Sequence, residues 1–125
     1  MMVYLVEDSL LVRERLKDGI REIDPGIRVC ESDSARDAVA AILEGHPDIV
    51  VLDLKLAEGS GMDVLKKVRK EGSLASVVVF SNHAETQYRR RCMAMGADHF
   101  FDKTRDFGSV LEVIRDCRQK QEGNR

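Results

Sequence analysis

Five short runs of β-branched and aliphatic residues alternate along the chain with segments whose apolar residues recur every three or four positions. The runs cover residues 3–6, 27–30, 49–52, 77–80 and 99–101. The first, third and fourth runs are apolar throughout, which is typical of strands buried on both faces of a parallel sheet covered by helices. The pattern therefore predicts five strands, each followed by a helix.

Capping and breaking residues mark where the intervening helices begin and end. A helix is expected over residues 10–22, and Pro25-Gly26 stops it. Ser34 and Ser60 are expected to begin the second and third helices as N-caps, because each has an aspartate three residues further on.

Gly45 and Gly96 are expected to end the second and fourth helices, and Asp106 to cap the fifth. Short connections between strands and helices favour right-handed crossovers and an α/β fold with a doubly wound, five-stranded parallel sheet. The chain is then one domain over residues 1–120, followed by a polar tail at 121–125.

Composition agrees with a single soluble domain. The 125 residues are 43% hydrophobic and 34% charged, and 20 basic against 22 acidic residues give a formal net charge of −2. This balance gives no electrostatic reason to expect direct nucleic-acid or membrane binding, and no secretion signal or membrane span is expected. Three widely spaced cysteines without a Cys-x-x-Cys pair favour reduced thiols and a cytoplasmic location.

Charged and polar residues follow four of the expected strands. They are Glu7 and Asp8 after the first strand, Asp53 after the third, Ser81 after the fourth and Lys103 after the fifth. The carboxyl ends of parallel strands share one edge, so these side chains should converge there. Three close carboxylates favour a hard cation such as Mg²⁺, and a rigid aspartate can attack phosphorus to form an aspartyl phosphate.

On these residues the chain resembles, over nearly its whole length, the receiver domain of two-component response regulators, of the chemotaxis-regulator-like kind. The spacing of 22 residues between Ser81 and Lys103 (103 − 81 = 22) is the one that family uses. The resemblance implies a flavodoxin-like (βα)5 fold with strand order 2-1-3-4-5.

The resemblance also implies a role for each site residue. Asp53 is the expected phosphoacceptor. Asp8 and Asp53 would ligate Mg²⁺ directly, Glu7 through water, and Lys55 through its backbone carbonyl.

Three further residues are expected to respond to the phosphoryl group. Ser81 would be the switch hydroxyl, Phe100 the aromatic that turns inward behind it, and Lys103 the cation that pairs with a phosphoryl oxygen. Phosphorylation would then change the face formed by the fourth helix, the fifth strand and the fifth helix.

The expected donor is a sensor histidine kinase or a phosphotransfer protein that docks on residues 10–22. The expected target is a downstream effector protein, or an output domain missing from the C-terminus. We expect no enzymatic turnover beyond the domain's own phosphorylation and dephosphorylation.

Four positions depart from the family pattern. Glu7 replaces the commoner aspartate, and Ala57 stands where proline is frequent. Asn82 replaces a small residue after the switch hydroxyl and could narrow access to the acyl phosphate. Thr104 replaces proline after the lysine, which predicts a trans bond there.

Simpler interpretations of the same residues stay open. Glu7 and Asp8 could cap the first helix, and Phe100 could be ordinary core. Residues 89–91, three arginines, could form a solvated face or bind an acidic partner. Lys55 and His83 could influence how water attacks the acyl phosphate.

Two other functions also stay open. One is a receiver-like interaction module that is never phosphorylated. The other is a Mg²⁺-dependent phosphohydrolase, which is less favoured because Lys55 stands where haloacid-dehalogenase-like enzymes need a second aspartate.

Overall fold

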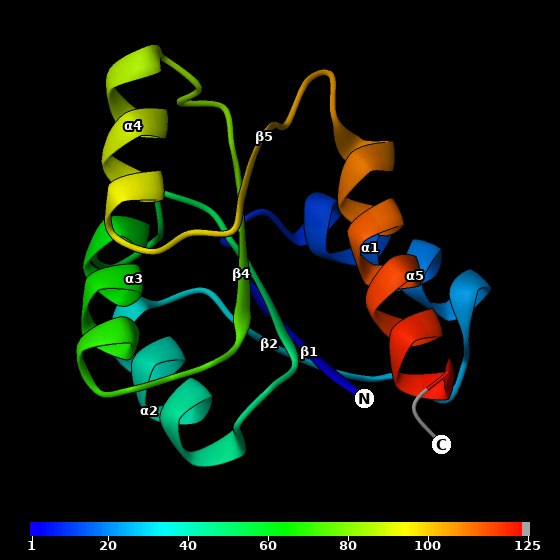
Figure 1. Ribbon diagram of the computed structural model, residues 1–125. Coiled ribbons are helices and arrows are strands. Elements are labelled where there is room, and N and C mark those ends of the chain that lie inside the picture. Colours follow the sequence, from blue (N-terminus) through cyan, green and yellow to red (C-terminus); the bar gives the residue numbers. More distant parts are fainter. Residues whose placement is uncertain (124–125) are drawn as a thin grey trace.

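The structure, a computed structural model, describes residues 1–123, which contain five strands and five helices in strict alternation (Figure 1). They are β1 (Met2–Val6), α1 (Leu10–Ile23), β2 (Arg28–Ser32), α2 (Ala35–Gly45), β3 (Ile49–Leu52), α3 (Gly61–Lys70), β4 (Ser76–Ser81), α4 (Thr86–Ala94), β5 (His99–Asp102) and α5 (Phe107–Gly123). Each apolar run overlaps one strand. The second run was placed too early, because β2 begins one residue later and includes Glu31 and Ser32.

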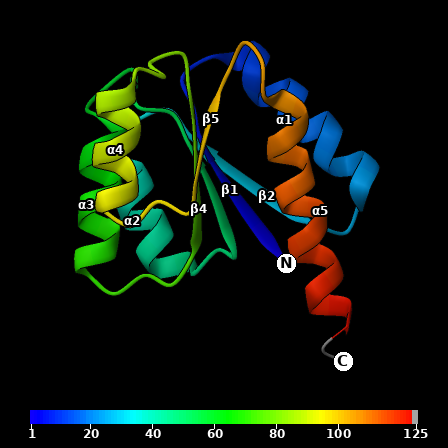
Figure 2. The same ribbon diagram turned by 45° about the horizontal axis from the view of Figure 1, so that its top comes forward.

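All five strands are parallel and lie in the order β2-β1-β3-β4-β5. Helices α1 and α5 cover one face of the sheet, and α2, α3 and α4 cover the other (Figures 1 and 2). This arrangement confirms the predicted doubly wound fold and its strand order. None of the helices within residues 1–123 combines the length and apolar character needed to cross a bilayer.

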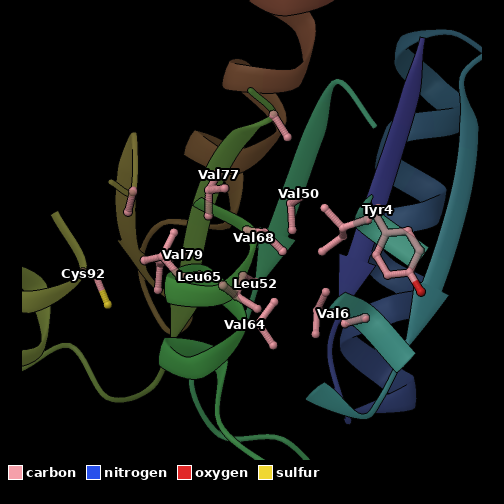
Figure 3. Close-up of a cluster of buried hydrophobic side chains, with 14 of the residues drawn as sticks. Tyr4, Val6, Val50, Leu52, Val64, Leu65, Val68, Val77, Val79 and Cys92 are labelled. Atoms are coloured by element: carbon pink, nitrogen blue, oxygen red, sulfur yellow. The ribbon is translucent and has the colours of Figure 1, made fainter. Parts of the chain in front are cut away.

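A separate hydrophobic cluster lies on each face of the sheet. Leu5 and Val6 are adjacent in β1 but belong to different clusters, because successive side chains of a strand point to opposite faces. Val6 packs in the cluster beneath α2, α3 and α4, with Leu52 and Leu65 (Figure 3). Burial of each such side chain contributes about 1.5–3 kcal/mol, so the two clusters fix the strands that carry the polar edge.

Serine side chains begin the first three helices. The Oγ of Ser34 accepts a hydrogen bond from the N–H of Asp37, and the Oγ of Ser60 accepts one from Met62, which confirms both predicted N-caps. The N-cap of α1 is Ser9, whose Oγ accepts from Val12. The acidic pair before it is therefore not needed as the cap of α1.

Two predicted helix boundaries agree with the structure, and the predicted start of the tail lies inside a helix. Gly45 is the last residue of α2, and His46 takes the left-handed conformation after it, with φ 48°. Asp106 lies directly before α5, as predicted, and its carbonyl accepts from the N–H of Val110 at 3.3 Å, while its Oδ2 accepts from the N–H of Asp102. Helix α5 continues to Gly123, so the tail predicted at 121–125 begins inside a helix, and its residues 124–125 lie outside the described residues.

Candidate functional site

The backbone of three predicted site residues is fixed by hydrogen bonds that continue the sheet beyond its strands. The N–H of Glu7 donates to the carbonyl of the last residue of β2 at 3.0 Å, and that of Asp53 donates to the last residue of β1 at 2.9 Å. The N–H of Lys103 donates to the last residue of β4 at 3.1 Å. The three side chains are thus held by the rigid sheet at its carboxyl edge.

Lys103 forms ion pairs with two buried carboxylates. Its Nζ lies 2.6 Å from Oε1 of Glu7 and 2.7 Å from Oδ2 of Asp53. The side chains are only 10%, 3% and 7% exposed, respectively. One ammonium therefore compensates two carboxylates that have little access to water.

The pKa values of Glu7 and Lys103 are both raised, but for different reasons. Burial raises the pKa of Glu7 most, and repulsion from Asp53 adds to it; hydrogen bonds from Lys103 and the N–H of Ser9 only partly offset these effects. For Lys103, burial lowers the pKa, but hydrogen bonds to Asp53 and Glu7 outweigh burial and raise it overall. The site thus holds Lys103 charged, while the charge on Glu7 is costly.

Asp8 adds a third, exposed carboxylate to this cluster. Carboxylate oxygens of Glu7, Asp8 and Asp53 all lie within 4.8 Å of one another. Oxygen ligands of this kind, with room for water on the exposed side, suit Mg²⁺, which keeps several waters when bound to proteins. The donor set therefore fits the predicted cation, which would supply charge that Lys103 alone does not.

The loop after Asp53 is held against its surroundings by backbone contacts. The N–H of Gly61 donates to the Leu54 carbonyl at 2.9 Å, and the backbones of Lys55 and Ser60 pair in antiparallel β fashion. A Cβ on Gly61 would lie 2.0 Å from the Asp53 carbonyl oxygen, far inside van der Waals contact. Only glycine permits this approach, so the start of α3 helps to fix the backbone of Asp53.

Ser81 is fully buried at the end of β4, and its Oγ accepts a hydrogen bond from the N–H of His83 at 3.1 Å. The loops after β3 and β4, together with the first turns of α3 and α4, line an open hollow of about 300 Å³. Its lining includes Lys55, His83 and Tyr88. The structure thus brings the two residues expected to influence hydrolysis, Lys55 and His83, to one hollow.

The segment after Lys103 is organised by Asp102. Both the N–H and the hydroxyl of Thr104 donate to Oδ1 of Asp102, at 2.8 Å and 2.7 Å. These two bonds hold the pKa of the Asp102 carboxyl below its ordinary value. All peptide bonds within residues 1–123 are trans, including the one before Thr104, as its departure from proline predicted.

Phe100 is buried, with 4% of its surface exposed, in the cluster beneath α2, α3 and α4. Arg89 covers it from α4: its Cζ lies 4.8 Å from the centre of the Phe100 ring. Two of the departures from the family pattern, Ala57 and Asn82, are exposed at the surface.

Two residues that shape this edge escaped the sequence interpretation. Gly61 directly follows an N-cap serine, and a glycine inside the first turn of a helix is a weak signal of close backbone approach. Arg89 stands in a run of three arginines, and nothing in the run distinguishes it from Arg90 and Arg91.

The sheet order, the two helical layers and the acidic edge define this molecule as an α/β domain of the receiver class. The sequence model of the response regulator receiver domain family matches residues 3–115, and the chain belongs to this family. The resemblance seen in the sequence is thereby confirmed.

Similar proteins come from several bacteria. The transcriptional activator protein ExaE of Pseudomonas putida is 30% identical over 115 residues, which cover 92% of this chain and 54% of ExaE. The structure of the response regulator domain of Thermotoga maritima CheB is 26% identical, with a TM-score of 0.81, over 95% of this chain and 94% of that domain. A LuxR-family two-component response regulator from Aurantimonas is 28% identical, with a TM-score of 0.81, over 92% and 82%.

The chain spans about half the length of the curated relatives that it matches, from 34% to 56% of those proteins. The shared part is the receiver domain, and these relatives are mostly regulators. The functions of the remaining parts of those relatives are not attributed to this chain.

Proposed function

We propose that this receiver domain accepts a phosphoryl group on Asp53 from a phosphohistidine donor and thereby regulates a signalling partner. The observation that carries the proposal is the ammonium of Lys103, which lies 2.7 Å from Asp53 and 2.6 Å from Glu7 at the carboxyl edge of the sheet. The sheet holds the Asp53 carboxylate in a fixed position, which suits in-line attack on a phosphoryl group. The neighbouring ammonium of Lys103 can bind the oxygens of that phosphoryl group.

In the proposed reaction, a carboxylate oxygen of Asp53 attacks the phosphorus while the P–N bond to the donor imidazole breaks. The imidazole nitrogen keeps the bonding pair and then takes up a proton, and the product is an aspartyl phosphate. Lys103 binds one phosphoryl oxygen, and the Ser81 hydroxyl donates to another.

The proposed cation site consists of Glu7, Asp8, Asp53 and the backbone carbonyl of Lys55. Bound there, Mg²⁺ would neutralise charge on the carboxylates and the phosphoryl oxygens during transfer. Glu7 has one methylene more than the family's usual aspartate, and both of its carboxylate oxygens already have partners, Lys103 and the N–H of Ser9. This occupancy supports an indirect role for Glu7, through water, and leaves the exposed Asp8 free for direct ligation.

The proposed docking surface for the donor is the first turn of α1. Leu10 and Leu11 are 62% and 70% exposed there, two and three residues after Asp8. Two exposed leucines beside the acidic cluster would bury apolar area against the donor and bring its phosphohistidine to Asp53.

The proposed output is a change in α4, β5 and α5 that follows movement of the Ser81 hydroxyl toward the phosphoryl group. Phe100, in β5, is already packed against the cluster beneath α4, so it can transmit this movement. The regulated partner is a separate effector protein or an output domain in the same polypeptide. On this proposal the domain turns over no external substrate.

One experiment distinguishes this function from the two alternatives. The protein is incubated with Mg²⁺ and acetyl phosphate, and its intact mass is followed over time. A hydroxylamine-sensitive gain of one phosphoryl group, lost in Asp53→Asn and kept in Asp63→Asn at an exposed acid of α3, supports the proposal. No adduct from any donor favours an interaction module, and steady phosphate release without an adduct favours a phosphohydrolase.

A further inference from the structure

Arg89 differs from the two arginines that follow it, because its guanidinium is committed to a contact inside the domain. Its Cζ lies 4.8 Å from the centre of the Phe100 ring, and its Nη1 donates a hydrogen bond to the Phe100 carbonyl at 2.9 Å. A guanidinium within about 6 Å of a ring centre gains cation–π attraction, and the fork of donors fixes its orientation. One side chain thus holds both the ring and the backbone of Phe100.

The same contact helps to close the free edge of the sheet at β5. The carbonyl of Phe100 faces away from β4 and is bound by Arg89. The next outward-facing residue, Asp102, donates its N–H to the Asp106 carboxylate, and its carbonyl accepts from the N–H of Asp106. Edge strands need such protection, because open backbone groups can pair with other chains. Arg89 therefore ties α4 to an edge strand that would otherwise be free to move away from it.

We infer that Arg89 is a positioning residue that holds Phe100 buried and α4 against β5 before any phosphoryl group is bound. The geometry supports this at both ends: Phe100 is 4% exposed, and Cys92, on the next turn of α4, is fully buried in the same cluster. Loss of the Arg89 contacts would uncover the Phe100 ring and also remove the hydrogen bond to the Phe100 carbonyl at the edge of the sheet.

The consequence for signalling rests on the proposed phosphorylation of Asp53. If phosphorylation favours the conformation with Phe100 inward, a residue that already holds the ring inward raises the population of that conformation. It thereby lowers the free energy needed to adopt this conformation on phosphorylation. Arg89 would then set how readily the domain is phosphorylated, although it lies outside the acidic cluster.

The first test follows the Phe100 ring directly in the full chain, without Mg²⁺ or phosphodonor. Labelling with 4-fluorophenylalanine gives one fluorine signal for each of the four phenylalanines, and Phe100→Leu assigns the relevant one. Arg89→Met keeps the aliphatic stem and removes the guanidinium; Arg89→Lys keeps the charge, and Arg90→Met is the matched control. We expect a larger solvent-isotope shift of the Phe100 signal in Arg89→Met, a smaller one in Arg89→Lys and none in Arg90→Met.

An unchanged Phe100 signal in Arg89→Met would overturn the inference. So would equal changes in all four signals, because they would show a general loss of structure. The second test measures the rate of phosphorylation by acetyl phosphate, for which we expect a roughly three- to tenfold decrease in Arg89→Met. Equal rates would refute the coupling. If the wild-type protein gains no phosphoryl group, the proposed function fails, while the fluorine signals still decide the position of Phe100.

Discussion

Lys103 and Asp53 are separated by 50 residues in the chain, yet Nζ and Oδ2 lie 2.7 Å apart at the edge of the sheet. Each residue directly follows a strand, and their backbone N–H groups bond to the two strands β4 and β1. The distance between the two side chains is therefore set mainly by the register of the sheet and less by the loops that follow β3 and β5. The pair gives Asp53 a fixed orientation and a cation that can pass from the carboxylate to a phosphoryl oxygen.

Loss of this cation should destabilise the domain most when no divalent ion is present. Lys103→Met leaves Glu7 and Asp53 buried without a counter-charge, and we expect the free energy of unfolding in EDTA to fall by about 1–3 kcal/mol. Millimolar Mg²⁺ should restore part of it, because a cation that binds only the folded state stabilises that state. Urea unfolding with and without Mg²⁺ measures both effects. The exposed Lys66→Met is the control, and equal losses in the two variants would contradict the account.

The raised pKa of Glu7 predicts a pH dependence of stability with a definite sign. Burial makes the folded state bind this proton more tightly than the unfolded state does. Its contribution to stability is therefore complete below the ordinary value of 4.5 and is lost as the pH rises through the raised folded value. In EDTA, Glu7→Gln should gain stability relative to the wild type as the pH rises.

Chemical unfolding at several pH values across that range tests this expectation, with Glu112→Gln, at an exposed position of α5, as the control. A difference between Glu7→Gln and wild type that stays constant with pH would show that Glu7 titrates alike in both states.

Gly61 should tolerate no side chain. A Cβ there would lie 2.0 Å from the Asp53 carbonyl oxygen, so Gly61→Ala must shift the backbone that carries the proposed acceptor. We expect a loss of about 1–3 kcal/mol in the free energy of unfolding and slower phosphorylation. Gly108, in α5, has open space around its Cα, and Gly108→Ala should instead gain about 0.5–1 kcal/mol. Similar thermal midpoints for the two variants would disprove the steric argument.

Lys55 and His83 should affect hydrolysis of the aspartyl phosphate, because both line the hollow of about 300 Å³ next to the site. We expect Lys55→Ala and His83→Ala to change the dephosphorylation rate several-fold, since shortened side chains alter the access and orientation of water. The loss of the phosphoryl adduct is followed by mass spectrometry after the donor is removed. Rates equal to wild type in both variants would mean that the hollow plays no part in hydrolysis.

The fold was predictable because its signals are local. Fully apolar runs such as Ile49–Leu52 identify buried strands, and Ser34 and Ser60 identify helix starts through hydrogen bonds within a few residues. The end of α2 at Gly45 was also predictable, whereas the left-handed conformation of His46 after it was not, because that conformation is rare for residues other than glycine. The position of Asp106 before α5 was predictable, but the hydrogen bond from the Asp102 N–H to its carboxylate was not, because that bond depends on the conformation of the turn after β5.

The convergence of Glu7, Asp53 and Lys103 followed from strand order, because residues after parallel strands meet at one edge. The sharing of one ammonium between two carboxylates did not follow, since it depends on rotamers and burial. The contact of Arg89 with Phe100 was equally inaccessible, because a run of three arginines carries no information on which one faces the sheet.

The most direct test of the central claim is to locate the phosphoryl group on the chain. Borohydride converts an aspartyl phosphate into homoserine, so peptide mapping after incubation with Mg²⁺ and acetyl phosphate marks the modified residue. We predict homoserine at position 53, dependent on both the donor and Mg²⁺. Homoserine at Asp8 or another carboxylate, or none under conditions that preserve acyl phosphates, would contradict the assignment of Asp53 as the acceptor.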